Sequence, residues 1–277
     1  MNNKKLITTQ EFEKLLQEVI DDLKQENNIV NKLIRDDVFK ILENHCYVVY
    51  YPLENENING FHVVRTIKNE SAHFVYINTA NTIERRIFAA AHELGHIWQV
   101  YQKLQKKCPA IDEYINSLWD GSNEEFVANK FAAQLLMPSD LFREEVTREL
   151  GDPKYNYNGK SISTANLLRV IVHLMDTFFV GFKATTRRLF EIGRYTEEVY
   201  NIIKTYEDSD IFKNILQEEE YTRLNKRPRH KSISNLTEII RKAEIDGCEL
   251  ESTIEVLKKD FDINTLDFSE SNNEIDF

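Results

Sequence analysis

The segment RRIFAAAHELGHIWQVYQ, residues 85–102, decides how this sequence is interpreted. It places His92 and His96 four residues apart, with Glu93 beside the first histidine, in an otherwise apolar stretch. Residues four apart lie on one face of an α-helix, so both imidazoles point the same way. Burying two imidazoles side by side costs free energy unless their ring nitrogens find partners. The segment therefore predicts a helix whose two histidines share a partner, either a metal ion or hydrogen-bonding groups.

A zinc ion satisfies such a pair, because tetrahedral sites hold imidazole nitrogens at about 2.0–2.1 Å. Glu93 lies about 100° around the helix from His92 and can reach a water on the metal. There it would be the general base in metal-assisted amide hydrolysis. Gly95 destabilises a helix by about 1 kcal/mol, which predicts that another backbone or a substrate approaches closely there. Hydrogen-bonded core histidines, with Glu93 in solvent, are the less favoured interpretation.

Catalytic zinc sites generally use three protein ligands, so the third must come from another segment. The stretch SNEEFVANKFAAQLLMP, residues 122–138, predicts a helix with Ser122 as N-cap and Pro138 at its end. Its first turn carries Glu124 and Glu125, and either carboxylate could face the metal. The residues alone leave the choice between them open.

The remaining pattern is typical of an α+β fold. Three short runs between residues 46 and 78 are rich in β-branched and aromatic residues and are separated by Asn- and Gly-containing turns. They predict a small antiparallel sheet beside the histidine helix. Helical periodicity is predicted over about 8–23, 29–44, 82–106, 139–149, 163–178 and 183–192, followed by a mainly helical C-terminal region.

Length and composition limit the domain organisation. The chain has 277 residues, of which 42% are hydrophobic, enough for one large domain or two modest ones with a real core. The character of the sequence changes to charged helical segments near residue 195. We expect a first domain over 1–195, with its core at about 40–195, and a helical extension of unknown role over 196–277.

Charge and cysteine content limit the partners and the compartment. The formal net charge of −11 argues against broad attraction to nucleic acid or to anionic membranes. Cys46, Cys108 and Cys248 are odd in number and form no CxxC pair, which favours a reducing compartment. We find neither a secretion signal nor a membrane-spanning stretch. The sequence predicts a cytoplasmic protein with no membrane partner.

Two further stretches have alternative interpretations. The basic segment NKRPRHK, residues 225–231, could contact nucleic acid, but a solvated loop between helices is favoured in so acidic a chain. The segment FFVGFKATTRRLFEIG, residues 178–193, could bind DNA or dock a substrate, but its apolar residues favour a packing role. A DNA-binding regulator is therefore the weakest functional hypothesis.

Two blocks together resemble the ImmA/IrrE family of zinc metallopeptidases. They are INTANTIERRIFAAAHELGHIW, residues 77–98, and EEFVANKFAAQLLMP, residues 124–138. The resemblance covers about 40–195 and implies a zincin-like fold that ends in a helix-turn-helix-like segment, where the match is weaker. It selects Glu125 over Glu124 as the third metal ligand. It also implies His92 and His96 as the other ligands and Glu93 as the catalytic base.

The same resemblance implies regulatory proteolysis. Members of the family cut helix-turn-helix repressors and so relieve repression of mobile elements, prophages, or stress and defence genes. Zinc is the expected cofactor, with manganese as the alternative. A donor for the oxyanion is also expected, and Tyr155, Tyr157 and His173 are equal candidates. The alternative function is a non-catalytic binding protein on a metallopeptidase scaffold.

Overall fold

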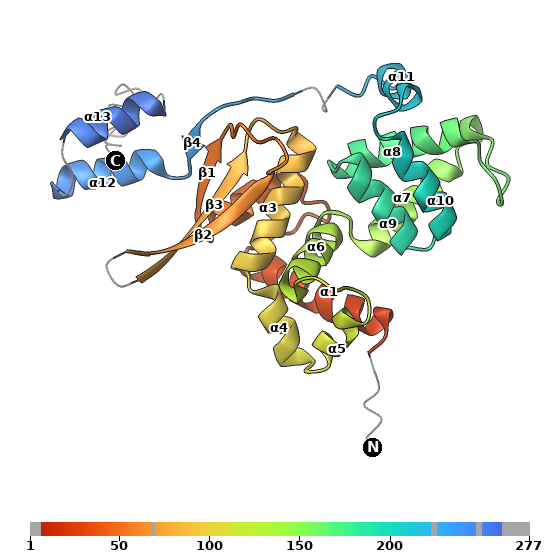
Figure 1. The fold of residues 1–277 in the computed structure, drawn as a ribbon, viewed down its shortest axis with the longest axis horizontal. Helices are drawn as coiled ribbons and strands as arrows, with labels where there is room; N and C mark the ends of the chain where they lie inside the picture. Colours follow the sequence, from red (N-terminus) through yellow and green to blue (C-terminus); the bar gives the residue numbers. More distant parts are fainter. Residues whose placement is uncertain (1–6, 68–69, 223–225, 248–250, 262–277) are drawn as a thin grey trace, which may run out of the picture.

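A computed structural model describes residues 7–67, 70–222, 226–247 and 251–261, and it confirms the α+β fold class (Figure 1). A small sheet and one group of helices come first along the chain. The α1 capping box between Thr8 and Glu11 is present as the sequence predicts. The elements of this first part are α1 (Thr9–Glu26), α2 (Asp37–Glu43), β1 (Tyr47–Tyr51), β2 (Gly60–Ile67), β3 (Glu70–Asn78), α3 (Ile83–Ile97), α4 (Val100–Lys107), α5 (Ile111–Asn116) and α6 (Asn123–Leu136).

The second part of the chain is mainly helical. Its helices α7 to α11 gather on one side of the first part, and α12 and α13 lie on the opposite side, beyond the sheet (Figure 1). Two single 3₁₀ turns, at Pro153–Tyr155 and Lys204–Tyr206, connect helices. The elements are α7 (Ser139–Leu150), α8 (Thr164–Phe178), α9 (Phe182–Glu191), α10 (Glu197–Ile203), α11 (Asp210–Glu218), β4 (Ser232–Ile233), α12 (Leu236–Asp246) and α13 (Glu251–Asp260).

The sheet is mixed, so the prediction of an antiparallel sheet was wrong in one pairing. The strand order is β2-β3-β1-β4, and β3 runs antiparallel to β2 but parallel to β1. The connection over residues 52–59 places β2 away from β1, and β3 then enters between them. Buried Asn78 holds that connection: its Oδ1 accepts from the backbone N–H of Leu53, and its Nδ2 donates to the carbonyl of Ile58.

The two faces of the sheet differ in character. Val48, Val75 and Ile77 are fully buried in the core shared with the helices. The opposite face carries ring pairs between neighbouring strands, such as Phe61 and Tyr76, whose centroids lie 4.8 Å apart. α3 packs against β2 and β3, which brings the histidine helix next to the edge of the sheet.

Two predicted helices are shorter than their periodicity suggested. The predicted helix 29–44 begins only at Asp37, because Asn28 and Arg35 adopt left-handed backbone conformations before it. The predicted helix 82–106 is divided at Gln99, whose φ of 53° ends α3 and starts α4 in a new direction. Apolar periodicity continues through this break, so the pattern alone does not reveal it.

Helices α7 to α11 share the core of the first part. Phe142 on α7 and Phe178 on α8 pack with ring centroids 5.1 Å apart, in the cluster that also contains the buried faces of α1, α3 and α6. Arg188 on α9 is buried and donates to the carbonyl of Met137, which ties α9 to the end of α6. Core residues continue past 195 as Ile203, Phe212, Ile215 and Tyr221.

The basic segment lies along the sheet. The Arg227 guanidinium pairs with Glu56, the Thr79 hydroxyl donates to the carbonyl of His230, and β4 pairs with β1. The predicted solvated loop between helices is confirmed for residues 226–231, which are exposed and neither helix nor strand, and this strap contacts the first part of the chain through its polar groups. Residue 225 of this segment, like Cys248, lies outside the described residues.

Two further properties bear on the sequence predictions. Within the described ranges, Cys46 and Cys108 are free thiols. None of the described helices is by itself long and apolar enough to cross a bilayer. Only α8 and α9 taken together reach that length and composition, and they are bent by 104°.

Candidate metal centre

α3 presents His92 and His96 on one face, as their spacing predicts. The helix begins after Thr82 and packs through small residues, among them Ala90 and Ala91, which are fully buried. The structure shows why a glycine fits at position 95. A Cβ there would lie 3.1 Å from Phe131 Cδ1 and 3.3 Å from the Ala128 Cα on α6. The predicted close backbone approach at this glycine is confirmed.

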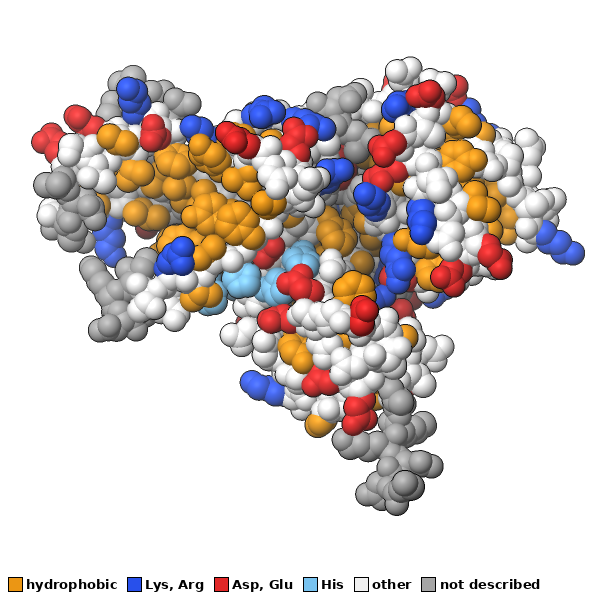
Figure 2. All heavy atoms as spheres, in the orientation of Figure 1, with side chains coloured by type: hydrophobic (Ala, Val, Ile, Leu, Met, Phe, Trp, Pro, Cys, Tyr) orange, Lys and Arg blue, Asp and Glu red, His pale blue; other side chains and the backbone are white. Residues whose placement is uncertain are grey.

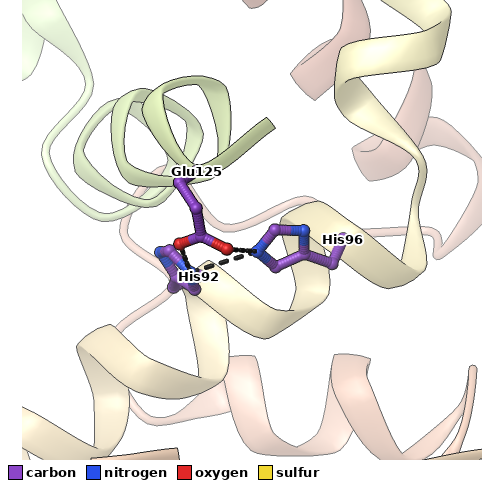
Figure 3. A group of neighbouring side chains, drawn as sticks. All are labelled: His92, His96 and Glu125. Atoms are coloured by element: carbon purple, nitrogen blue, oxygen red, sulfur yellow. Dashed lines mark hydrogen bonds and ion pairs between the residues drawn. The ribbon is translucent and has the colours of Figure 1, made fainter. Parts of the chain in front are cut away.

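α6 brings Glu125 to the two histidines. Ser122 caps this helix by accepting the backbone N–H of Glu125, so the glutamate sits in the first turn. Its carboxylate lies between the imidazoles (Figure 3): Oε2 is 3.2 Å from His92 Nε2, and Oε1 is 3.3 Å from His96 Nε2. The two Nε2 atoms are 3.1 Å apart.

These separations fit a metal site. Ligand atoms held about 2.0–2.1 Å from one ion at tetrahedral angles lie about 3.3 Å from one another. The two Nε2 atoms are separated by 3.1 Å, and each lies 3.2 to 3.3 Å from a different oxygen of the Glu125 carboxylate, so one donor atom from each residue lies within 4.8 Å of the other two. The set of two imidazoles and one carboxylate is also one that catalytic zinc uses.

Asn129, one turn along α6, fixes the tautomer of His92. Its Nδ2 donates to the backbone carbonyl of Glu125 at 2.9 Å, which turns Oδ1 toward the histidine. His92 Nδ1 lies 3.2 Å from that oxygen and must carry a proton to donate to it. The lone pair of His92 is therefore on Nε2, the atom that faces Glu125 and His96. Such outer partners orient metal-binding histidines and raise their basicity.

Glu124 takes a different place from Glu125. Its Oε1 lies 3.7 Å from His96 Nδ1, on the side of the ring opposite Nε2, and it accepts a hydrogen bond from Gln102 Nε2 at 3.3 Å. The two glutamates that the residues alone could not separate are therefore distinguished by position. One faces both Nε2 atoms, and the other faces the outer nitrogen of His96.

Burial favours the neutral forms of His92 and Glu93. Desolvation lowers the pKa of His92, and the neighbouring His96 lowers it further. A neutral imidazole is the form that binds a metal ion, because its Nε2 lone pair is then free. Burial also raises the pKa of Glu93 from its ordinary value of 4.5 to about 7, with a smaller contribution from the Glu125 carboxylate.

Glu93 is buried, which excludes the interpretation that placed it in solvent. Only 6% of the residue is exposed, and its Oε2 lies 3.4 Å from His62 Nδ1 on β2. The His62 ring also lies beside that of His96, with centroids 5.4 Å apart. A carboxylate with a pKa near 7, next to two histidines, has the proton affinity that a general base needs at neutral pH.

Sequence reasoning missed two residues of this centre. Asn129 stands inside the second block of the family resemblance, but no spacing rule indicates its contact with His92. His62 has no metal-like spacing to another histidine, and only the packing of β2 on α3 brings it to Glu93. A histidine on the strand that faces the motif helix is visible only once the order of the strands is known.

The three candidates for the oxyanion donor gather elsewhere. His173 on α8 pairs with Glu219 at 3.0 Å, and the Tyr155 ring lies beside it with centroids 6.4 Å apart. Tyr157, two residues after Tyr155 in the loop before α8, is exposed. No described contact joins any of the three to His92, His96 or Glu93, so the structure does not bring them to the centre.

Comparison with known proteins adds the family. No curated protein matches the chain. The model of the IrrE N-terminal-like domain, Peptidase_M78, matches residues 43–190, which is more than half of the chain and includes α3, α6 and the whole His-His-Glu group. A chain that carries this domain, with a donor set compatible with a metal ion, belongs to the IrrE N-terminal-like family of metallopeptidases.

Proposed function

We propose that this chain is a zinc-dependent endopeptidase. His92, His96 and Glu125 would hold the ion through two Nε2 atoms and one carboxylate, and manganese is the alternative metal. A bound ion of this kind polarises the scissile carbonyl and lowers the pKa of a coordinated water toward about 7. The observation that carries the proposal is the convergence of one donor atom from each of the three residues within 4.8 Å of one another, next to a buried glutamate.

Glu93 would act as the general base. It takes the proton of the attacking water, and it then passes that proton to the amine that leaves. Its burial among apolar neighbours supports this role, because desolvation keeps the pKa of the carboxyl near neutrality. His62, in contact with the Glu93 carboxylate, would hold that carboxylate in place during both transfers.

Asn129 and Glu124 would orient the ligands. Asn129 keeps the proton of His92 on Nδ1, and Glu124 faces the corresponding nitrogen of His96. Both contacts leave Nε2 as the donor atom. A group in which both ligand tautomers are already selected loses less entropy when the metal binds.

The substrate class follows from the family resemblance and belongs to the proposal. We infer that the enzyme acts in the cytoplasm and cuts a helix-turn-helix transcriptional repressor. The cut would relieve repression of a mobile element, prophage, stress or defence operon. A narrow range of protein substrates is consistent with the cleft between two helical walls that adjoins the centre at Asn129.

A second candidate function is a binding protein on a peptidase scaffold. The observation that favours it is the helical pair α12 and α13, which forms a small cluster of its own and exposes Ile239, Ile245 and Val256. Exposed apolar residues are typical of a partner surface, and these lie on two helices that pack together. Against it stands Glu93, because a purely structural metal site needs no buried general base.

The test compares cells that produce the wild-type chain with cells that produce Glu93→Gln. A mass-spectrometric survey of new protein N-termini, with and without DNA damage, detects every cut that depends on the glutamate. We expect a wild-type-specific cut inside a helix-turn-helix repressor. Identical N-termini in both cell lines under damage, with both proteins carrying metal, would favour the binding protein instead.

A further inference from the structure

A cleft of about 1040 Å³ opens beside the metal centre. One wall is made by α3 and α6, and the other by α9, α10 and the turn that follows. Asn129 lines the cleft and also accepts the hydrogen bond of His92, so one end of the cleft adjoins the centre. The volume is that of the larger ligand pockets in proteins, and it accommodates several side chains.

The cleft is basic although the chain is acidic. Its lining contains six cationic side chains and three carboxylates, whereas the whole chain has a net charge of −11. Figure 2 shows Lys and Arg side chains on the wall to the right of the histidines. Glu191 is shared by Lys130, Arg187 and Arg188, at 2.6, 3.0 and 3.5 Å, so one carboxylate serves three cations.

Two cations of the cleft have no carboxylate partner among the described residues. Arg85 on α3 is exposed and makes no described ion pair. Lys204, after α10, donates to the Asn201 side chain and lies 5.6 Å from the centroid of the Tyr200 ring. These two charges come from opposite walls, so an acidic group between them would be attracted by both.

The rest of the lining is aromatic. Phe88 lies one turn after Arg85 on α3, and Phe126 lines the same wall from α6. Trp119 is 45% exposed, and its ring lies 6.3 Å from that of Phe126. Flat apolar side chains beside unpaired cations suit a ligand with both apolar and acidic groups.

We propose that this cleft binds the substrate on one side of the cleaved bond, as an extended segment with apolar side chains followed by an acidic one. The inference rests on the proposed peptidase function. Arg85 and His92 are seven residues apart on α3, which corresponds to about 10 Å along a helix. An extended chain covers that length in about three residues. The acidic side chain is therefore expected about three residues from the cut.

A polypeptide fits this cleft better than a nucleic acid does. Phosphates at every nucleotide would meet the three carboxylates of the lining, Glu84, Glu191 and Glu207, as well as its cations. A peptide places an isolated carboxylate where the unpaired cations are and leaves apolar groups elsewhere.

The test measures binding separately from cleavage. The zinc-loaded Glu93→Gln protein is titrated into two fluorescein-labelled peptides that share aromatic and aliphatic residues, one with glutamates and one with glutamines. Fluorescence anisotropy gives both affinities. We expect the glutamate peptide to bind about tenfold more tightly, and the difference to shrink at high salt.

Arg85→Glu with Lys204→Glu should abolish the difference. The matched control is Lys160→Glu with Lys242→Glu, which makes the same charge change on exposed residues outside the cleft and should retain it.

The outcomes separate this proposal from the peptidase proposal. Equal affinities for both peptides, or a difference that survives the Arg85 and Lys204 changes, would overturn the acidic subsite. So would a single-stranded oligonucleotide that binds more tightly than the glutamate peptide and depends on the same two residues. A glutamate preference without cleavage by the zinc-loaded wild type supports the subsite and counts against the peptidase. Cleavage without the glutamate preference supports the peptidase and counts against the subsite.

Discussion

The burial of Glu93 costs stability whenever its carboxyl group is charged. A carboxyl group that is 6% exposed, with its pKa raised to about 7, is held in an environment that disfavours its charge. Between pH 4.5 and 7 the folded protein therefore binds more protons at Glu93 than the unfolded chain does. The free energy of unfolding must fall as the pH rises through this window. Above pH 7 the full cost of burying the charged Glu93 carboxylate is present.

We therefore predict that Glu93→Gln stabilises the protein once the metal has been removed by a chelator. Gln has a similar shape and no charge to desolvate. At pH 8 the variant should exceed the wild type by about 2–3 kcal/mol in free energy of unfolding, and at pH 4 the two should be nearly equal. Urea unfolding at a series of pH values measures both curves. A constant difference between them across the series would contradict the raised pKa.

The sequence predicted much of this centre at the scale of single residues. The helical period alone places His92 and His96 on one face, and the resemblance to a family selects Glu125. What could not be predicted are the contacts between elements, because Asn129 and His62 reach the centre from α6 and β2. Their roles depend on how close those elements lie to α3, and no spacing within one segment encodes that distance.

At the scale of elements, the spacing of α3 and α6 determines whether the three donors meet. Gly95 sets this spacing, since any Cβ there lies 3.1 Å from the buried Phe131 side chain and 3.3 Å from the α6 backbone. The α6 backbone cannot move away from α3 without also moving Glu125 away from the two histidines. A glycine inside α3 is therefore retained at a cost in helix stability of about 1 kcal/mol.

We predict that Gly95→Ala lowers the free energy of unfolding by about 1–2 kcal/mol, although alanine is the better helix former. The loss should be partly recovered in Gly95→Ala with Phe131→Leu, because the smaller side chain relieves the nearest contact. Thermal or urea unfolding of the two single variants and the double variant gives the coupling. A Gly95→Ala protein more stable than the wild type would show that the helices can separate freely.

Element boundaries were less predictable than element types. The N-caps at Thr8 and Ser122 and the end of α6 before Pro138 follow from local chemistry and agree with the structure. The helix boundary at Gln99 does not follow from local chemistry, because glutamine has no preference for the left-handed backbone that divides α3 from α4. Tertiary packing of α4 against α1 and α6 imposes that conformation.

At the scale of the whole molecule, a late segment completes an early sheet. The backbone N–H of Val48 donates to Ser234 Oγ, and Ser234 donates back to the carbonyl of Val48, both at 2.8 Å. With β4 and the strap over residues 226–231, these bonds cover the β1 edge. The strand order explains why the sequence prediction of the sheet was wrong: turn signals reveal where strands end, but not which strands become neighbours.

A chain that ends at residue 222 should therefore lose about 2–4 kcal/mol of unfolding free energy, from several hydrogen bonds of about 1 kcal/mol each. It should also aggregate more readily, because the β1 edge is uncovered. A chain that ends at residue 235 keeps the strap and β4 and is the matched control. Unfolding and light scattering of both chains test this. Equal stability of the two would assign the strap no structural role.

The most direct test of a metal centre at His92, His96 and Glu125 is the metal content of the zinc-loaded and dialysed protein, measured by inductively coupled plasma mass spectrometry. It compares the wild type with Glu125→Gln and Glu124→Gln, which change neighbouring carboxylates in the same way. We predict about one zinc ion per chain in the wild type and in Glu124→Gln. In Glu125→Gln we predict that the affinity for zinc is weakened about a hundredfold or more. A wild-type chain without metal, or equal losses in both variants, would contradict it.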